Sequence, residues 1–63
     1  MEALKTYRVY STQEHQPIMQ LAALYYEIDR DGNLNFYIAE EKGARPSATF
    51  ANMLWWGVEE WKR

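Results

Sequence analysis

The sequence predicts a small α+β domain: a three-stranded antiparallel sheet (order β-β-β-α) with one C-terminal helix packed on one of its faces. Three observations predict this fold. Strand-forming residues open the chain, two apolar runs flank a turn rich in Asp and Gly, and apolar residues recur at helical spacing further on. With 63 residues, the range 1–63 accommodates one domain and one hydrophobic core.

The first expected strand spans residues 4–10, which are rich in Tyr, Thr and Val. Side chains alternate between the two faces of a strand, so Tyr7 and Val9 share one face and are expected in the core. The polar segment 11–17 ends in Pro17 and predicts a loop.

Residues 17–26 are open to two interpretations. They can extend into the second strand, or a short helix can begin near Pro17, where proline is tolerated in the first turn. Ile18, Leu21 and Tyr25 would share one face of such a helix.

A β-hairpin is expected over residues 23–40. A three-residue loop at Arg30-Asp31-Gly32 puts Gly32 where a type I turn with a G1 bulge needs a left-handed residue. This register alone sorts the two faces, since a slip by one residue would mix acidic and apolar side chains. It pairs Ile28 with Leu34, Tyr26 with Phe36, Leu24 with Ile38, Glu27 with Asn35, Tyr25 with Tyr37, and Ala23 with Ala39.

Residues 47–62 are expected to form the helix. Ser47 is a suitable N-cap after a proline, and Gly57 disfavours a helix by about 1 kcal/mol relative to alanine. Four apolar residues recur at spacings of four, four and three, which is one helical stripe. The expected core is Tyr7, Val9, Leu24, Tyr26, Ile28, Leu34, Phe36, Ile38 and the helical stripe Phe50, Leu54, Val58 and Trp61.

We identify no catalytic, cofactor-binding or metal-binding residues. Oxygen side chains alternate around Gly32 as in a calcium loop, but Ile38 stands where that loop needs a bidentate Glu, so a hairpin turn is the better interpretation. His15 is the single histidine and the chain has no cysteine. The sequence therefore gives no reason to expect an enzyme or a cofactor.

The informative feature is an excess of aromatic residues: five Tyr, three Trp and two Phe. A core of this size cannot enclose them all, and exposed Tyr, Trp and Met are typical of protein interfaces. The interface candidates are Tyr25, Tyr37, Met53, Trp55 and Trp56.

These observations predict a small non-catalytic protein-binding module that inhibits or regulates a partner protein, as phage-encoded or accessory inhibitors of host or defence enzymes do. We expect a homodimer in the cytoplasm, with no membrane span. The alternative is single-stranded nucleic-acid binding by stacking on Tyr25 and Tyr37. A net charge of −2 and the lack of clustered cations make nucleic acid the weaker choice.

Overall fold

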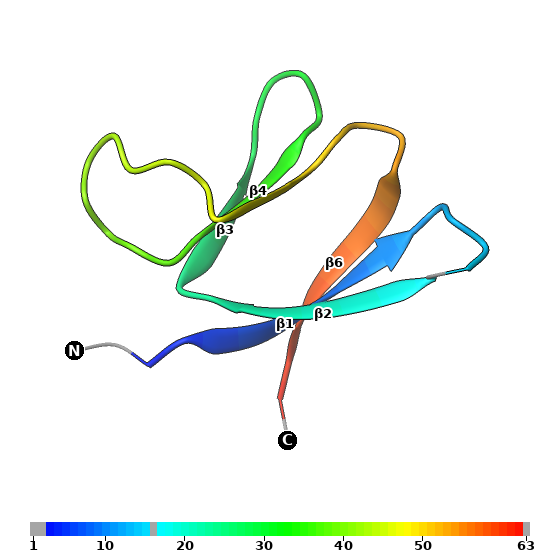
Figure 1. The fold of residues 1–63 in the computed structure, drawn as a ribbon, viewed down its shortest axis with the longest axis horizontal. Helices are drawn as coiled ribbons and strands as arrows, with labels where there is room; N and C mark the ends of the chain where they lie inside the picture. The colour runs from blue at the N-terminus through cyan, green and yellow to red at the C-terminus, as the bar shows by residue number, and fades with distance from the viewer. Residues whose placement is uncertain (1–2, 16, 63) are drawn as a thin grey trace.

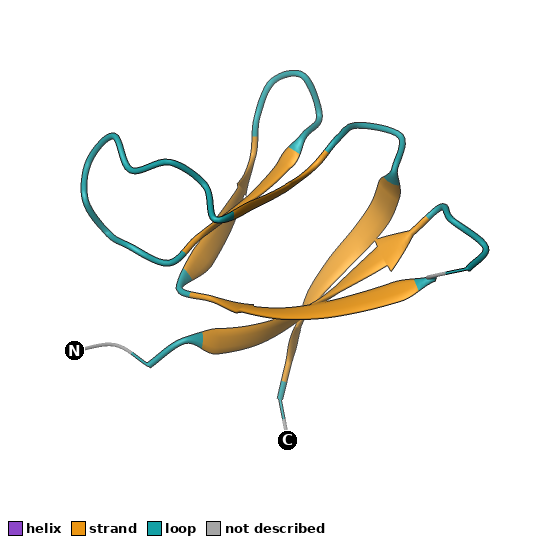
Figure 2. Cartoon of the chain, in the orientation of Figure 1, coloured by secondary structure: helices purple, strands orange, loops and turns teal. Residues whose placement is uncertain are grey.

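The computed structural model describes residues 3–15 and 17–62. Its elements are β1 (Lys5–Ser11), β2 (Ile18–Ala23), β3 (Tyr25–Ile28), β4 (Leu34–Tyr37), β5 (Ala48–Phe50) and β6 (Trp55–Trp61). They form two three-stranded antiparallel sheets, with strand orders β2-β1-β6 and β3-β4-β5 (Figure 1). Figure 2 shows strands and loops throughout the described chain, with no helix. The predicted α+β fold is therefore wrong: the described chain is all-β.

The strand predicted over residues 4–10 is confirmed as β1, with Tyr7 and Val9 buried. We expected this strand to join the hairpin in one sheet. It instead pairs with β2 on one side and with β6 on the other. Within residues 17–26, Ile18–Ala23 form β2 and Tyr25 begins β3, so this segment is strand and not helix. The single residue Leu24 separates β2 from β3, so the chain passes from one sheet to the other at this bend. In the expected loop 11–17, Gln16 lies outside the described residues.

The hairpin of β3 and β4 is confirmed in its predicted register. The ladder pairs Tyr25 with Tyr37, Tyr26 with Phe36, Glu27 with Asn35, and Ile28 with Leu34. Gly32 has a φ of +85°, the left-handed conformation that its place in the loop requires. The ladder ends at Tyr25, and beyond it the Leu24 N–H donates to the Tyr37 carbonyl at 2.8 Å. The expected pairing of Ala23 is wrong, because that residue ends β2 opposite Lys5.

The helix predicted over residues 47–62 is wrong. Ser47 is not an N-cap: its N–H and its hydroxyl both donate to the Phe36 carbonyl, at 2.7 and 3.2 Å, and lead the chain into β5 beside β4. Met53 has a φ of 76°, which no residue inside a right-handed helix adopts. The Leu54 N–H donates to the Ala51 carbonyl at 3.0 Å, which closes a β-turn between β5 and β6.

The composition of β6 explains why it is a strand. Three Trp and a Val within seven residues fit a pleated sheet, and they outweigh a helical stripe interrupted by Gly57. Gly57 pairs directly with Tyr10 of β1, and a Cβ added to it would lie 3.4 Å from the Tyr10 ring. The ring therefore covers the glycine, a known way of stabilising glycine within a sheet. A bulge next to this pair places Trp55 opposite Ser11.

The hydrophobic core lies where the two sheets meet. Its buried residues come mainly from the central strands: Tyr7 and Val9 of β1, Leu34 and Phe36 of β4, with Ala23 at the end of β2. The Tyr7 ring lies 5.4 Å from the Phe36 ring, which joins the two sheets. The half-buried residues packed around this cluster are Leu21, Ala48, Phe50, Trp55 and Val58.

Part of the predicted core is exposed because four of the six strands lie at sheet edges. Tyr26 and Ile28 belong to the edge strand β3, and both side chains are exposed to solvent. Leu54 and Trp61 are exposed because they belong to a turn and to a strand face, not to one helical stripe. Ile38 is also exposed, and Leu24 is half-buried. The predicted core positions Leu34 and Phe36 are confirmed.

The molecule is a thin plate. Its Cα atoms span 36 × 31 × 14 Å, and its radius of gyration of 11.7 Å exceeds the roughly 10.6 Å expected for a compact domain of this length. Nearly every strand therefore borders solvent on one face.

Candidate protein-binding surface

The sheet β2-β1-β6 has one face on the core and one face towards solvent, which we call the outer face. On β1 the core-facing residues alternate with Thr6, Arg8 and Tyr10, which point outwards. Strand pairing extends these three positions into rows across the sheet. The rows are Ile18–Tyr10–Gly57, Gln20–Arg8–Glu59 and Ala22–Thr6–Trp61, and the bulge adds Trp56 beside the first.

Tyr10 lies at the centre of the apolar row. Its ring is 5.0 Å from the Trp56 ring, and its hydroxyl donates to a carboxylate oxygen of Glu59. Ile18 lies opposite Tyr10 on β2 and is exposed. Trp56 is 68% exposed, so this row presents a broad apolar surface that the protein itself does not cover.

Arg8 lies in the row Gln20–Arg8–Glu59, and its guanidinium stacks on the Trp61 ring. Its guanidinium carbon is 3.5 Å from the centroid of the Trp61 ring, a cation–π contact worth about 0.5–1 kcal/mol at an exposed site. Its Nε is shielded from solvent and has no hydrogen-bond partner among the described residues. The side chain is therefore positioned by stacking on the Trp61 ring.

The electrostatics of the outer face are balanced. Arg8 and Glu59 are cross-strand partners of opposite charge. The hydrogen bond to Glu59, with burial and the Glu59 charge, raises the pKa of Tyr10, while Arg8 acts in the opposite direction. Tyr10 thus remains a neutral hydrogen-bond donor. A ligand would meet aromatic rings around one compensated charge pair.

The structure brings two predicted interface residues together on the other sheet. Tyr25 and Tyr37 stack with ring centroids 4.9 Å apart and an interplanar angle of 13°. Burial raises the pKa of Tyr25, as do Glu27, Tyr37 and Glu40. Each ring covers one face of the other, and the acidic surroundings oppose a phosphate backbone.

The other three candidates lie at separate places. Met53 is at the tip of the β5–β6 turn and is 80% exposed. Trp56 is on the outer face, as described above. Trp55 points the other way: it packs against the core, and its Nε1–H donates to the Gly32 carbonyl at 3.1 Å. Trp55 therefore holds the β3–β4 turn in place.

Sequence reasoning missed Tyr10, Arg8, Glu59 and Trp61 as members of this surface. Their proximity depends on the pairing of β1 with β6, which the helical interpretation of residues 47–62 concealed. The signal was present in the density of Trp and Val over β6, which is typical of a strand.

The Asp-rich turn forms a polar network. One Asp29 carboxylate oxygen accepts the N–H groups of Asp31 and Asn33, at 3.0 and 2.9 Å, and the other accepts the side-chain amides of Asn33 and Asn35, at 3.2 and 3.3 Å. The Asn35 oxygen accepts the Thr49 hydroxyl at 2.8 Å. These hydrogen bonds, led by that from the Asn33 backbone, lower the pKa of Asp29.

This network engages both Asp29 carboxylate oxygens and the Asn35 amide oxygen in hydrogen bonds that shape the turn. In the part of the chain that the structure describes, no three His, Cys, Asp or Glu residues are grouped so as to hold a metal ion. The described part also contains no helix with the length and apolar character to cross a membrane.

Comparisons with protein-family models, with curated proteins and with solved structures find no match to this chain.

Proposed function

We propose that this chain is a non-catalytic protein-binding module that contacts its partner through the outer face of the β2-β1-β6 sheet. The observation that carries this proposal is the ordered group of four outer-face side chains, Trp56, Tyr10, Arg8 and Trp61. Trp, Tyr and Arg are the residue types that dominate binding energy at protein interfaces.

The arrangement of these four side chains favours tight binding. Tyr10 is fixed between Trp56 and Glu59, and Arg8 is fixed against Trp61, before any partner arrives. Side chains that are already ordered lose less conformational entropy on association, which otherwise costs about 0.5–1.5 kcal/mol for each side chain. Because the face is charge-balanced, its partner is expected to offer an apolar surface with one acceptor for Arg8.

Such a module would inhibit or regulate its partner by covering part of the partner's surface. The lack of cysteine agrees with a partner in a reducing compartment such as the cytoplasm. The alternative, single-stranded nucleic-acid binding on Tyr25 and Tyr37, has less support because the rings stack on each other and lie close to acidic side chains.

The test is affinity capture from extract of the native host, with mass spectrometry of the captured proteins. Trp56→Ala removes an outer-face ring, and Tyr37→Ala is the matched control on the other sheet. We expect a partner that the wild type and Tyr37→Ala retain and that Trp56→Ala binds at least roughly thirtyfold more weakly, as for a residue worth 2 kcal/mol.

Two results would reject the proposal. One is a Trp56→Ala protein with unchanged circular dichroism that retains every partner. The other is binding of single-stranded oligonucleotides at low salt that Tyr37→Ala abolishes, which would favour the alternative.

A further inference from the structure

We propose that the free edge of β2 pairs antiparallel with β2 of a second copy, so that two copies share one six-stranded sheet. The proposal concerns self-association and does not depend on what the outer face binds.

The strand β2 is an unprotected edge of its sheet. β1 pairs with one side of β2, and no strand in the described residues pairs with the other side. Proteins usually protect such an edge with charged residues, proline or a bulge. The strand Ile18–Ala23 contains none of these, and no Asp, Glu, Lys or Arg occurs from residue 17 to residue 26. An uncharged edge of this length is a template for another strand.

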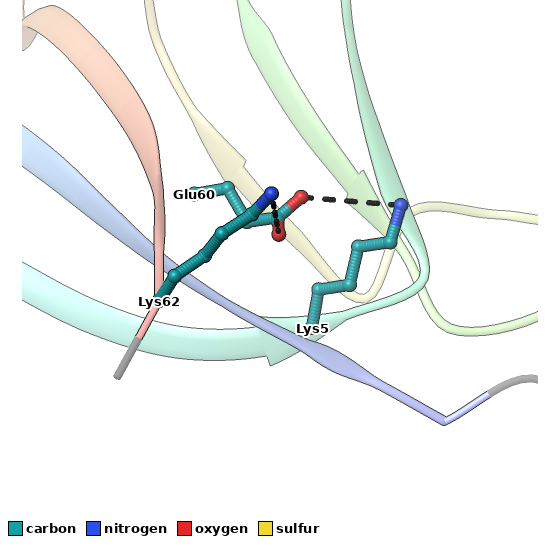
Figure 3. A network of polar contacts seen from close by, with 3 residues as sticks. All are labelled: Lys5, Glu60 and Lys62. Atoms are coloured by element: carbon teal, nitrogen blue, oxygen red, sulfur yellow. Dashed lines mark ion pairs between the residues drawn. The ribbon is translucent and has the colours of Figure 1, made fainter.

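The other edge strands differ from β2. β6 carries Glu59 and Glu60, and Glu60 lies between Lys5 and Lys62 at 3.9 and 3.8 Å (Figure 3). β3 contains Glu27, and β5 has three residues. Among the described edge strands, β2 therefore combines the greatest length without charge and the least protection.

The hydrogen bonds between β1 and β2 show which backbone groups of β2 face the free edge. The Ser11 N–H donates to the Pro17 carbonyl at 2.9 Å, which makes these two residues a hydrogen-bonded pair of the β1–β2 ladder. Such pairs alternate along an antiparallel ladder, so the odd-numbered residues of β2 bond to β1. The N–H and C=O groups of Ile18, Gln20 and Ala22 therefore face the free edge.

These three residues determine a register. With Gln20 opposite Gln20 of the second copy, Ile18 lies opposite Ala22 at both ends, and every edge-facing N–H and C=O finds a partner. Met19 then lies opposite Leu21 on the core side. The register places a large apolar residue against a smaller one and an amide against an amide, without any like charges in contact.

The exposed area of the chain is larger than that of a compact monomer of the same mass. The structure exposes 5091 Å² of surface. A compact monomer of 7.5 kDa exposes roughly 4,200 Å². The excess of roughly 800–900 Å² is close to what each partner buries in an interface of standard size.

Single cysteines test the register, because the chain has no cysteine of its own. In the proposed dimer the two Gln20 Cα atoms are about 5.5 Å apart, within the span of a disulfide. Two Ile18 positions are roughly 14 Å apart. We expect Gln20→Cys to oxidise to a covalent dimer at least roughly tenfold faster than Ile18→Cys or Ala22→Cys alone, and a mixture of the latter two to form the mixed dimer readily.

Sedimentation equilibrium of the unmodified chain at about 100 μM complements this test, and we expect a dimer mass. Gln20→Lys, which places two like charges at the two-fold axis, should shift the chain to monomer, whereas Gln13→Lys in the exposed 11–17 connection should not. A monomer mass for the unmodified chain would overturn the proposal. Equal oxidation rates for the three single-cysteine variants would do the same.

Discussion

Replacing Gly32 with alanine tests how firmly the β3–β4 turn is docked on the β5–β6 turn. Gly32 has a φ of +85°, and a Cβ built there lies 2.8 Å from the Asn52 side-chain Cγ. An L-residue in this conformation costs about 1–2 kcal/mol. Moving Asn52 away from a preferred rotamer costs about 0.5–1.5 kcal/mol more. We expect Gly32→Ala to lower the free energy of unfolding by about 1.5–3.5 kcal/mol, out of the roughly 3–9 kcal/mol typical for this length.

Gly43 provides a matched control. Its φ is +84°, but a Cβ there would meet nothing within 4 Å. Gly43→Ala should therefore incur the conformational cost alone, about 1–2 kcal/mol. Adding Asn52→Ala to Gly32→Ala should recover the difference, because it removes the crowded side chain and leaves the Asn52 N–H to Asn33 hydrogen bond intact.

The assay is thermal and urea unfolding followed by circular dichroism. Each kcal/mol corresponds to about 4–8 °C in Tm for a domain of this size. The reasoning is refuted if Gly32→Ala and Gly43→Ala are equally destabilised. It is equally refuted if Asn52→Ala fails to restore any stability to the Gly32 variant.

Three further predictions use the same assay. Phe36→Ala, at a fully buried position that joins the two sheets, should cost about 3–5 kcal/mol. Ile38→Ala, 55% exposed, should cost less than about 1 kcal/mol, and equal losses would place the core elsewhere. Trp55→Phe should cost about 1 kcal/mol by removing the hydrogen bond to the Gly32 carbonyl, and an unchanged Tm would show that the bond is unimportant. The lowered pKa of Asp29 means that its contribution is present above the usual carboxyl pKa of 3.8 and is lost as the pH falls through the lower folded value. Asp29→Asn should therefore flatten the fall in stability below about pH 4, and an identical pH profile would contradict the network.

The turn and the register of the hairpin could be predicted because their determinants are local, whereas its expected extension to Ala23 was wrong. The predicted register separates acidic from apolar side chains on the two faces and puts a glycine at the one loop position that needs a positive φ. The pairs from Tyr25–Tyr37 to Ile28–Leu34 and the φ of Gly32 confirm it. Strand β1 was likewise predictable from composition and alternation.

Residues 47–62 could not be predicted correctly because the spacing of their apolar residues and their composition indicate different structures. Phe50, Leu54, Val58 and Trp61 fit a helix by spacing, whereas the identity of the residues around Gly57 fits a strand. The tertiary pairing of β6 with β1 decides between them, and no local pattern reveals it. The outer face was missed for the same reason. Met53 and Trp56 are exposed as expected, but the expectation rested on a helix that the structure does not contain. Their role in binding stays a prediction.

The pairing of β1 with β6 has a consequence for how the chain folds. Tyr10 and Glu59, which hydrogen-bond across these strands, are 49 residues apart in sequence. Pairing strands that are this far apart in sequence requires closing a long loop, and the entropy cost of that closure comes before most contacts form. We therefore expect the chain to fold in milliseconds to seconds and not in microseconds. During synthesis, Tyr7 and Val9 cannot be fully buried until Val58 has left the ribosome. The hairpin of β3 and β4, whose contacts are local, can form before that.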